Sequence, residues 1–120
     1  VCSYGISNQF TLAFDTHKFE ARYSDTLLGP LPQAADLYRE RSPIFRVDQI
    51  VDPLIVFQGT DDNVVPQAQA DTLVAALKRR GVPHEYHLFE GEGHGWRRPE
   101  TIDAYFRATL AFLEQHVLFT

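Results

Sequence analysis

Cysteine is nearly absent from this sequence, in which Cys2 is the only one. A single thiol excludes an internal disulfide and cannot supply a thiolate cage for a metal. We therefore expect a reducing, cytoplasmic location. Long apolar runs are also missing, since no window approaches the roughly 18 to 20 unbroken apolar residues of a membrane span. A basic segment followed by an apolar one, the mark of a secretory signal, is not visible at the start, and we expect no membrane partner.

Positive charge is scarce as well. Eleven Lys and Arg residues stand against sixteen Asp and Glu residues, and the formal net charge is −5. The basic residues are scattered along the chain, whereas nucleic-acid binding needs a clustered basic surface, so we expect no nucleic-acid partner. The 120 residues are 44% apolar, which is typical of a globular protein of one domain.

The middle of the chain has the pattern of a parallel α/β sheet. Residues 53–58 are an apolar run without alternation, which is typical of a strand covered on both faces. A helix is predicted over 66–80, with Pro66 at its first position and Gly81 just past its end. Residues 83–89 form the next predicted strand. Two strands joined by one helix lie parallel, so their carboxyl ends share one edge of the sheet.

Shorter signals organise the first part of the chain. Residues 1–5 have the composition of a strand that ends at a glycine, and residues 7–14 are expected to be irregular. Apolar and aromatic residues spaced four apart predict a helix over 16–28, which stops at a Gly-Pro pair. A second short helix is predicted over 32–41, where Ser42-Pro43 ends it.

Residues 44–52 are expected to connect this helix to the sheet, with one helical turn at 47–50. A final helix is predicted from Pro99, and its apolar residues are expected on one side. These are Ile102, Tyr105, Phe106, Leu110, Leu113 and Val117. The whole pattern predicts an α/β fold of about three parallel strands with flanking helices. Because the chain has no methionine and starts inside an apparent strand, we expect it to be the C-terminal part of a longer polypeptide.

Polar residues follow both parallel strands where each strand ends. Asp61 and Asp62 come after the first, and His94 follows the second in the loop Glu-Gly-Glu-Gly-His-Gly. Because the carboxyl ends of parallel strands meet at one edge, we expect an acid and a histidine side by side. The Gly-x-x-Asp spacing favours Asp62 over Asp61. Capping of the next helix is the other role open to these carboxylates, and we expect one to cap while the other orients a base.

A histidine at such an edge can act as a general base, because this residue type ordinarily titrates near neutrality. A carboxylate on its second ring nitrogen would fix the tautomer. A metal site of Glu90, Glu92 and His94 is the less favoured alternative, since a second histidine at ligand spacing is missing. The remaining histidines are interpreted as ordinary surface residues: His17, His84, His87 and His116.

The nucleophile of such a site cannot be found in the sequence. No Gly-x-Ser-x-Gly elbow occurs, and the serines lack the strand-to-helix glycine turn that exposes a hydroxyl. These serines are Ser3, Ser7, Ser24 and Ser42. Cys2 lies inside the first predicted strand, so a thiol nucleophile is not expected.

Several segments resemble the C-terminal part of the prolyl oligopeptidase family of α/β-hydrolases, especially its acylaminoacyl-peptidase and dipeptidyl-peptidase-like members. They are Tyr4-Gly5-Ile6-Ser7, residues 16–20, residues 38–43, residues 57–66 (Phe-Gln-Gly-Thr-Asp-Asp-Asn-Val-Val-Pro) and residues 89–95 (Phe-Glu-Gly-Glu-Gly-His-Gly). Each segment alone is modest, but their order and spacing together are specific. Trp96 departs from the phenylalanine that often follows the His-Gly pair.

The resemblance implies an α/β-hydrolase fold and a Ser-Asp-His triad in which Asp62 orients His94 and the serine lies upstream of Val1. It also implies a peptide or acyl-peptide substrate for the full-length enzyme. We expect no cofactor and no metal. The chain alone is expected to be inactive, because the nucleophile and the oxyanion donors lie outside it. An unpaired sheet edge is expected to favour a homo-oligomer.

Two other interpretations stay open. The same fold serves carboxylesterases and dienelactone-type hydrolases, which share the Asp and His loops. From a different class, the chain could be a non-catalytic α/β module that binds a partner through its exposed edge.

Overall fold

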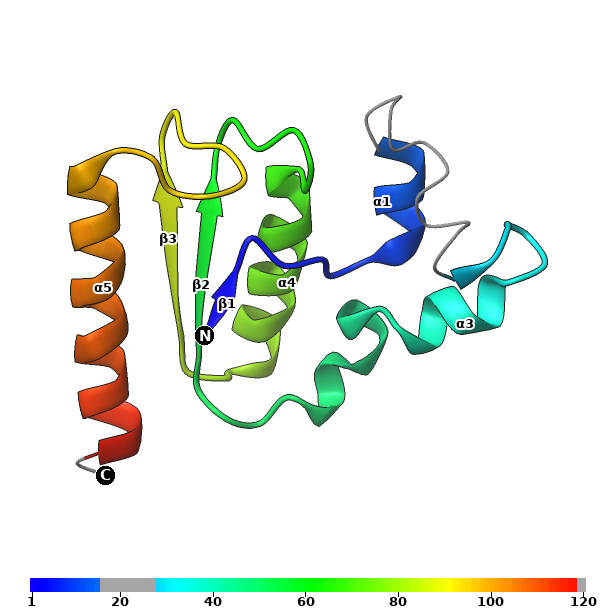
Figure 1. Cartoon of the computed structure of the whole chain (residues 1–120). Helices are drawn as coiled ribbons and strands as arrows, with labels where there is room; N and C mark the ends of the chain where they lie inside the picture. Colours follow the sequence, from blue (N-terminus) through cyan, green and yellow to red (C-terminus); the bar gives the residue numbers. More distant parts are fainter. Residues whose placement is uncertain (16–27, 119–120) are drawn as a thin grey trace.

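Three parallel strands form the centre of the computed structural model, which describes residues 1–15 and 28–118 (Figure 1). β2 (Leu54–Gly59) lies in the middle and pairs with β1 (Cys2–Ser3) on one side and β3 (His84–Phe89) on the other. All pairings are parallel. The loops that leave β2 and β3 therefore emerge together, at the upper edge of the sheet in Figure 1. The predicted α/β class is confirmed.

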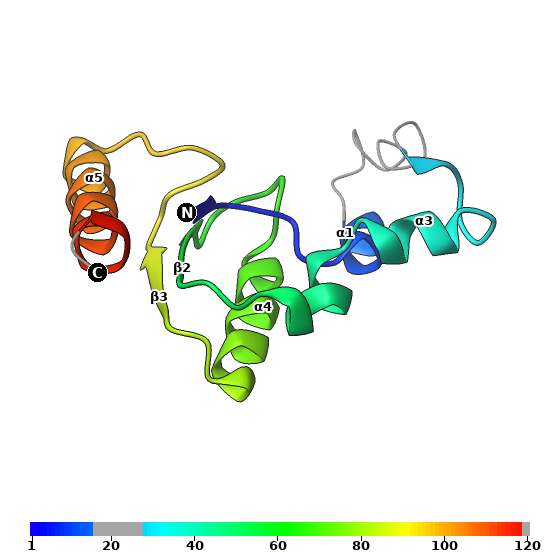
Figure 2. The same cartoon turned by 90° about the horizontal axis from the view of Figure 1, so that it is seen from below.

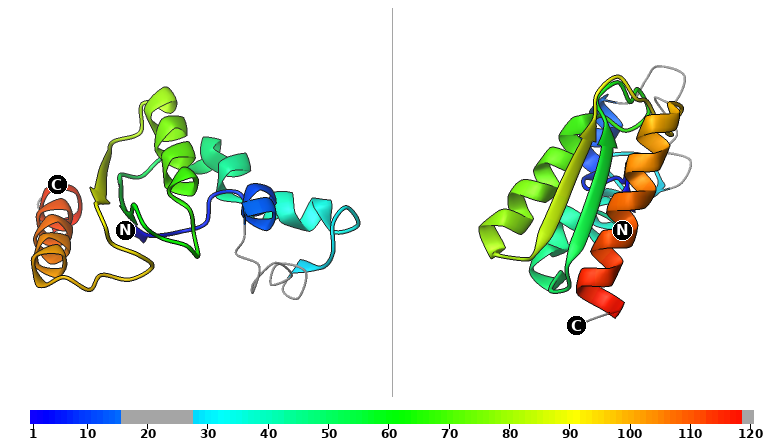
Figure 3. Two further views of the ribbon diagram at one scale, coloured as in Figure 1. Left: turned by 90° about the horizontal axis from the view of Figure 1, so that it is seen from above. Right: turned by 90° about the vertical axis from the view of Figure 1, so that its left-hand side faces the viewer.

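Two helices cover the two faces of this sheet, as Figures 2 and 3 show. α4 (Gln67–Arg80) connects β2 to β3 and packs Leu77 against Val56. α5 (Pro99–Leu113) packs Phe112 on the opposite face. Successive residues of a strand point to opposite faces, so β2 contributes side chains to both apolar clusters.

β2 is buried along nearly its whole length, as its unbroken apolar run predicts. Ile55, Val56 and Phe57 are each at most 1% exposed, because elements on both faces and both edges cover them. The strand starts one residue later than predicted, at Leu54. Pro53 has no backbone N–H to offer the ladder.

The ends of α4 differ in how well the sequence predicts them. Pro66 has an extended conformation with φ −60° and ψ 150°, so it precedes the helix and Gln67 is the first helical residue. The prediction of Pro66 at the first helical position is therefore wrong by one residue. Gly81 adopts the left-handed conformation with φ 72°, which confirms the predicted glycine stop.

Residues 7–14 were predicted to be irregular, and this is wrong, because they contain most of α1 (Gln9–Asp15). The Oδ1 atom of Asn8 accepts hydrogen bonds from the backbone N–H groups of Phe10 at 3.0 Å and Thr11 at 3.3 Å. Asn8 thus caps the first turn, a role for which asparagine is favoured.

Two short helices are described within residues 28–53, between α1 and β2. α3 (Ala35–Glu40) confirms the helix predicted over 32–41, with a later start. η2 (Pro43–Gln49) is a 3₁₀ helix that begins one residue before the predicted connector 44–52, and it is longer than the single turn expected there. The helix predicted over 16–28 falls, apart from its last residue, outside the described residues.

The apolar side predicted for the final helix is mostly exposed and, apart from Tyr105, does not face the sheet. Tyr105 packs with Phe112 against the sheet. Phe106 and Leu110, by contrast, are 64% and 56% exposed. The helix carries two apolar stripes, and the sheet covers only one of them. The chain continues as a π-helix, η3 (Glu114–Leu118). No helix within the described ranges is long and apolar enough to cross a membrane.

Candidate active site

Asp62 and His94 meet at the carboxyl edge of the sheet. The Nδ1 atom of His94 lies 2.8 Å from the Oδ2 atom of Asp62. The Asp62 side chain is completely buried, whereas that of His94 is 37% exposed. A carboxylate only accepts hydrogen bonds, so the proton of this pair lies on Nδ1. The Nε2 atom of His94 is then the ring nitrogen that can take a further proton.

The second oxygen of Asp62 fixes the carboxylate in place. Oδ1 accepts hydrogen bonds from the backbone N–H groups of Val64 and Val65, both at 2.8 Å. Gln58 is fully buried. Its side-chain nitrogen Nε2 donates a hydrogen bond to the Val65 carbonyl at 2.9 Å and lies 3.5 Å from Asp62 Oδ2. The carboxylate therefore has little freedom to rotate away from His94.

Of the two aspartates, Asp62 alone contacts His94 and the turn before α4, and neither Asp61 nor Asp62 caps that helix. The Oδ2 atom of Asp62 contacts His94 Nδ1, and its Oδ1 atom accepts from Val65 N–H in the turn that ends two residues before α4 begins. This turn is not a helix cap, so the expected division between a capping and an orienting aspartate is wrong. The side chain of Asp61 is exposed, and its backbone N–H donates to the Glu92 carbonyl at 2.9 Å.

The two loops are joined along their length by backbone contacts. Thr60 N–H donates to the Phe89 carbonyl at 3.1 Å, and Gly91 N–H donates to the Thr60 hydroxyl at 2.8 Å. Gly59 comes so close to the second loop that a Cβ there would lie 2.2 Å from the Glu92 carbonyl oxygen. Only glycine permits this approach.

The loop around His94 bends through glycines, as the sequence predicts. Gly91 and Gly95 have φ of 78° and 121°, a region that residues with a Cβ rarely adopt. Gly95 N–H donates to the Gly93 carbonyl at 3.0 Å, so the backbone turns tightly around His94.

Aromatic rings line one side of His94. The Tyr4 ring centroid lies 4.5 Å from the His94 ring and 5.1 Å from that of Trp96, which in turn contacts Phe89 at 4.9 Å. Tyr4 follows β1 and has φ 42°, an uncommon value for a residue with a Cβ. Tyr4 was not predicted as a site residue. Its place at the carboxyl end of a third parallel strand was the available signal.

The other residues considered from the sequence have different surroundings. The described residues contain no group of three or more His, Cys, Asp and Glu that could hold a metal ion. His87 stacks on Phe57 with ring centroids 5.3 Å apart and pairs with Glu85 at 3.2 Å. The hydroxyls of Ser7 and Ser42 are buried and donate to the carbonyls of Gln69 and Tyr38. His17 and Ser24 lie outside the described residues.

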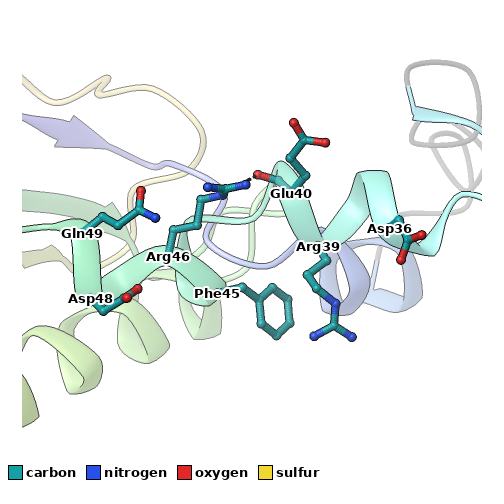
Figure 4. A pocket seen from close by; sticks show the side chains of 7 residues that line it. All are labelled: Asp36, Arg39, Glu40, Phe45, Arg46, Asp48 and Gln49. Carbon is teal, nitrogen blue, oxygen red and sulfur yellow. Dashed lines mark hydrogen bonds between the residues drawn. The ribbon is translucent and has the colours of Figure 1, made fainter.

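A separate surface pocket lies between α3 and η2 (Figure 4). Acidic and basic side chains both occur among its lining residues, which are Asp36, Arg39, Glu40, Phe45, Arg46, Asp48 and Gln49. Arg39 lies over the Phe45 ring at 5.1 Å, and Arg46 donates to the Glu40 carbonyl at 3.2 Å. Neither Asp62 nor His94 lines this pocket.

Comparison with known proteins decides the family. The sequence pattern that defines the prolyl oligopeptidase family matches residues 1–119 of this chain. The chain belongs to the prolyl oligopeptidase family. The resemblance expected from the sequence is thereby confirmed, and with it the α/β-hydrolase fold.

Curated relatives and solved structures agree with this family. The chain is 46% identical over 76 residues to dipeptidyl aminopeptidase BIII of Pseudoxanthomonas mexicana. The matched region covers 63% of this chain and 11% of that protein. It is 42% identical over 62 residues to dipeptidyl peptidase family member 6 of Caenorhabditis elegans, or 52% of this chain and 8% of that protein. The chain thus spans about a tenth of the length of these relatives.

A puromycin-hydrolyzing peptidase of Mycobacterium tuberculosis has a similar structure. The TM-score is 0.93 at 39% identity, over 98% of this chain and 18% of that one. Acylaminoacyl peptidase of Pyrococcus horikoshii superposes with a TM-score of 0.87 over 96% of this chain and 19% of that one. Its identity is 22%, so this likeness shows the fold alone.

Proposed function

We propose that this chain supplies the acid and the base of a serine-type peptidase site, with Asp62 orienting His94. The contact of 2.8 Å between Asp62 Oδ2 and His94 Nδ1 is the observation that carries the proposal. It leaves Nε2 as the proton acceptor, which is the atom that a general base presents to a nucleophile in a Ser-His-Asp arrangement.

The reaction is an acyl transfer in two steps. Nε2 of His94 takes the proton from a serine hydroxyl while the serine oxygen attacks the substrate carbonyl carbon, and the imidazolium then gives this proton to the leaving amine. Water attacks the resulting acyl-enzyme ester in the same way, with His94 again accepting and returning a proton. The buried Asp62 carboxylate stabilises the imidazolium that forms in each step.

The serine must come from a segment other than these 120 residues, because their sequence has no Gly-x-Ser-x-Gly elbow. We therefore place the activity in a longer polypeptide and expect the 120-residue chain alone to hydrolyse nothing. The relatives are called dipeptidyl aminopeptidase and puromycin-hydrolyzing peptidase, names that describe cleavage of amide bonds. Peptide or acyl-peptide bonds are the substrate class that we propose.

The test measures hydrolysis of a dipeptidyl arylamide and an acyl-peptide by the full polypeptide. His94→Ala and Asp62→Ala are each expected to lower kcat/KM by about 10³-fold or more. Asp61→Ala is the matched control, since it removes the neighbouring, exposed carboxylate and is expected to retain activity.

Three outcomes would contradict the proposal. Unchanged hydrolysis in His94→Ala and Asp62→Ala would exclude the triad roles. Hydrolysis of esters without hydrolysis of amides would favour the carboxylesterase alternative. An inactive full polypeptide that binds a partner through these residues would favour the interaction module.

A further inference from the structure

Glu92 is a buried carboxylate in the loop between β3 and α5, and it takes no part in the proton transfers described above. It is 2% exposed, which is unusual for a glutamate unless its charge is matched by donors. Only Gly93 separates it from His94 in the sequence. The loop that presents the imidazole therefore contains a second, hidden acid.

The side chain of Glu92 binds the backbone of the two residues just before α5. Its oxygens accept hydrogen bonds from the backbone N–H groups of Arg97 at 3.2 Å and Arg98 at 3.2 Å. The Nε atom of Arg98 lies 3.9 Å from the same carboxylate. A negative charge is favourable where backbone N–H groups converge at a helix N-terminus.

Burial by itself would raise the pKa of the Glu92 carboxyl. Hydrogen bonds from the Thr101 side chain and from the backbone of Arg98 and Arg97, together with the Arg98 charge, outweigh burial and lower the pKa below its ordinary value. The carboxyl group is thus ionised in the folded protein at neutral pH, because these donors stabilise its charged form.

The backbone of Glu92 binds the other half of the site. Its carbonyl accepts the N–H of Asp61 at 2.9 Å, next to the residue that orients His94. Glu92 therefore joins three segments: the loop after β2 through its carbonyl, the loop of His94 through its own position, and α5 through its carboxylate.

We propose that Glu92 is a positioning residue that holds the His94 imidazole against Asp62 by fixing its loop between α5 and the loop after β2. The proposal rests on the proposed function for its effect on catalysis. Its structural part, the Nδ1 contact to Asp62, can be measured without any activity. Reacting groups must be held to within about 0.5 Å, and a displacement of about 1 Å can lower the rate about 100-fold.

The first experiment records the imidazole N–H signals of ¹⁵N-labelled 120-residue chain by NMR. The Nδ1 proton of His94 is expected to be visible and shifted downfield in the unchanged chain, because it is hydrogen-bonded to Asp62. In Glu92→Gln this signal is expected to be lost or to exchange at least about 10-fold faster. Glu90→Gln is the matched control, because Glu90 lies on the same loop with an exposed side chain, and it is expected to keep the signal.

The second experiment measures kcat and KM of the full polypeptide. Glu92→Gln is expected to lower kcat by about 10- to 100-fold and to leave KM nearly unchanged, since the Glu92 side chain is buried and closed to a substrate. Thr101→Val, which removes one donor to the carboxylate, is expected to give a smaller loss in both experiments. It keeps the proposal testable if circular dichroism shows that Glu92→Gln unfolds.

A Glu92→Gln chain that remains folded with the His94 Nδ1 proton unchanged would overturn the positioning role. So would equal losses in Glu90→Gln and Glu92→Gln. If the full polypeptide proves inactive, the proposed function fails, and the NMR comparison still decides whether Glu92 positions His94.

Discussion

Replacing Gly59 by alanine is expected to push apart the two loops that form the site. A Cβ at this position meets the Glu92 carbonyl oxygen at 2.2 Å and the Gly93 carbonyl oxygen at 2.7 Å. Ordinary contacts of this kind are about 3.4 Å or longer, so the loop of His94 must move by about 1 Å. Both contacts are with backbone atoms, which cannot turn away as the end of a side chain could.

The size of the effect follows from what this movement breaks. Overpacking costs about 1 to 3 kcal/mol, and loss of the hydrogen bond between Asp61 N–H and the Glu92 carbonyl adds about 1 kcal/mol. The free energy of unfolding is therefore expected to fall by about 2 to 4 kcal/mol. In the full polypeptide, a shift of about 1 Å at His94 is expected to lower kcat by about 100-fold.

Urea denaturation followed by circular dichroism measures the change in stability, and kcat of the full polypeptide measures the change in the site. Gly93→Ala is the matched control, since its Cβ would lie 3.8 Å from the Asp61 carbonyl oxygen in ordinary contact. It is expected to be tolerated. A Gly59→Ala variant with an unchanged urea midpoint would refute the close approach of the two loops.

Two further predictions follow from the described residues. Folding lowers the pKa of Glu92 from its ordinary value of 4.5, so the folded carboxyl binds a proton less readily than the unfolded one. The ionised carboxylate therefore stabilises the fold fully at a pH above 4.5, and this stabilisation is lost as the pH falls below 4.5. Urea midpoints measured between neutral and acidic pH should show this loss in the unchanged chain, and Glu92→Gln should remove this part of it. We also expect the 120-residue chain to self-associate through the exposed stripe of α5 and the side of β1 that no described strand pairs with. Phe106→Glu should weaken this association, and sedimentation of a folded monomer at high micromolar concentration would contradict it.

The sequence predicts best those elements whose signals lie in adjacent residues. The apolar run of β2 and the glycine after α4 are each determined by adjacent residues, and both were predicted correctly. The cap at Asn8 is also a local signal, and it marks the start of the helix α1 that was not predicted. Asp62 and His94 were predicted as a pair because two parallel strands place their carboxyl ends together whatever the length of the connection.

The sequence by itself determined the order of β2, α4 and β3, the parallel direction of the two strands, and therefore the edge at which Asp62 and His94 meet. Tertiary structure alone decided which apolar stripe of α5 is covered, since helical periodicity shows which residues share a face but not what lies opposite it. Tertiary structure also brought Tyr4 against His94 and the Glu92 carboxylate against the start of α5. These contacts join segments that pattern rules treat separately, because they depend on the distances between packed elements and not on the spacing of residues along the chain.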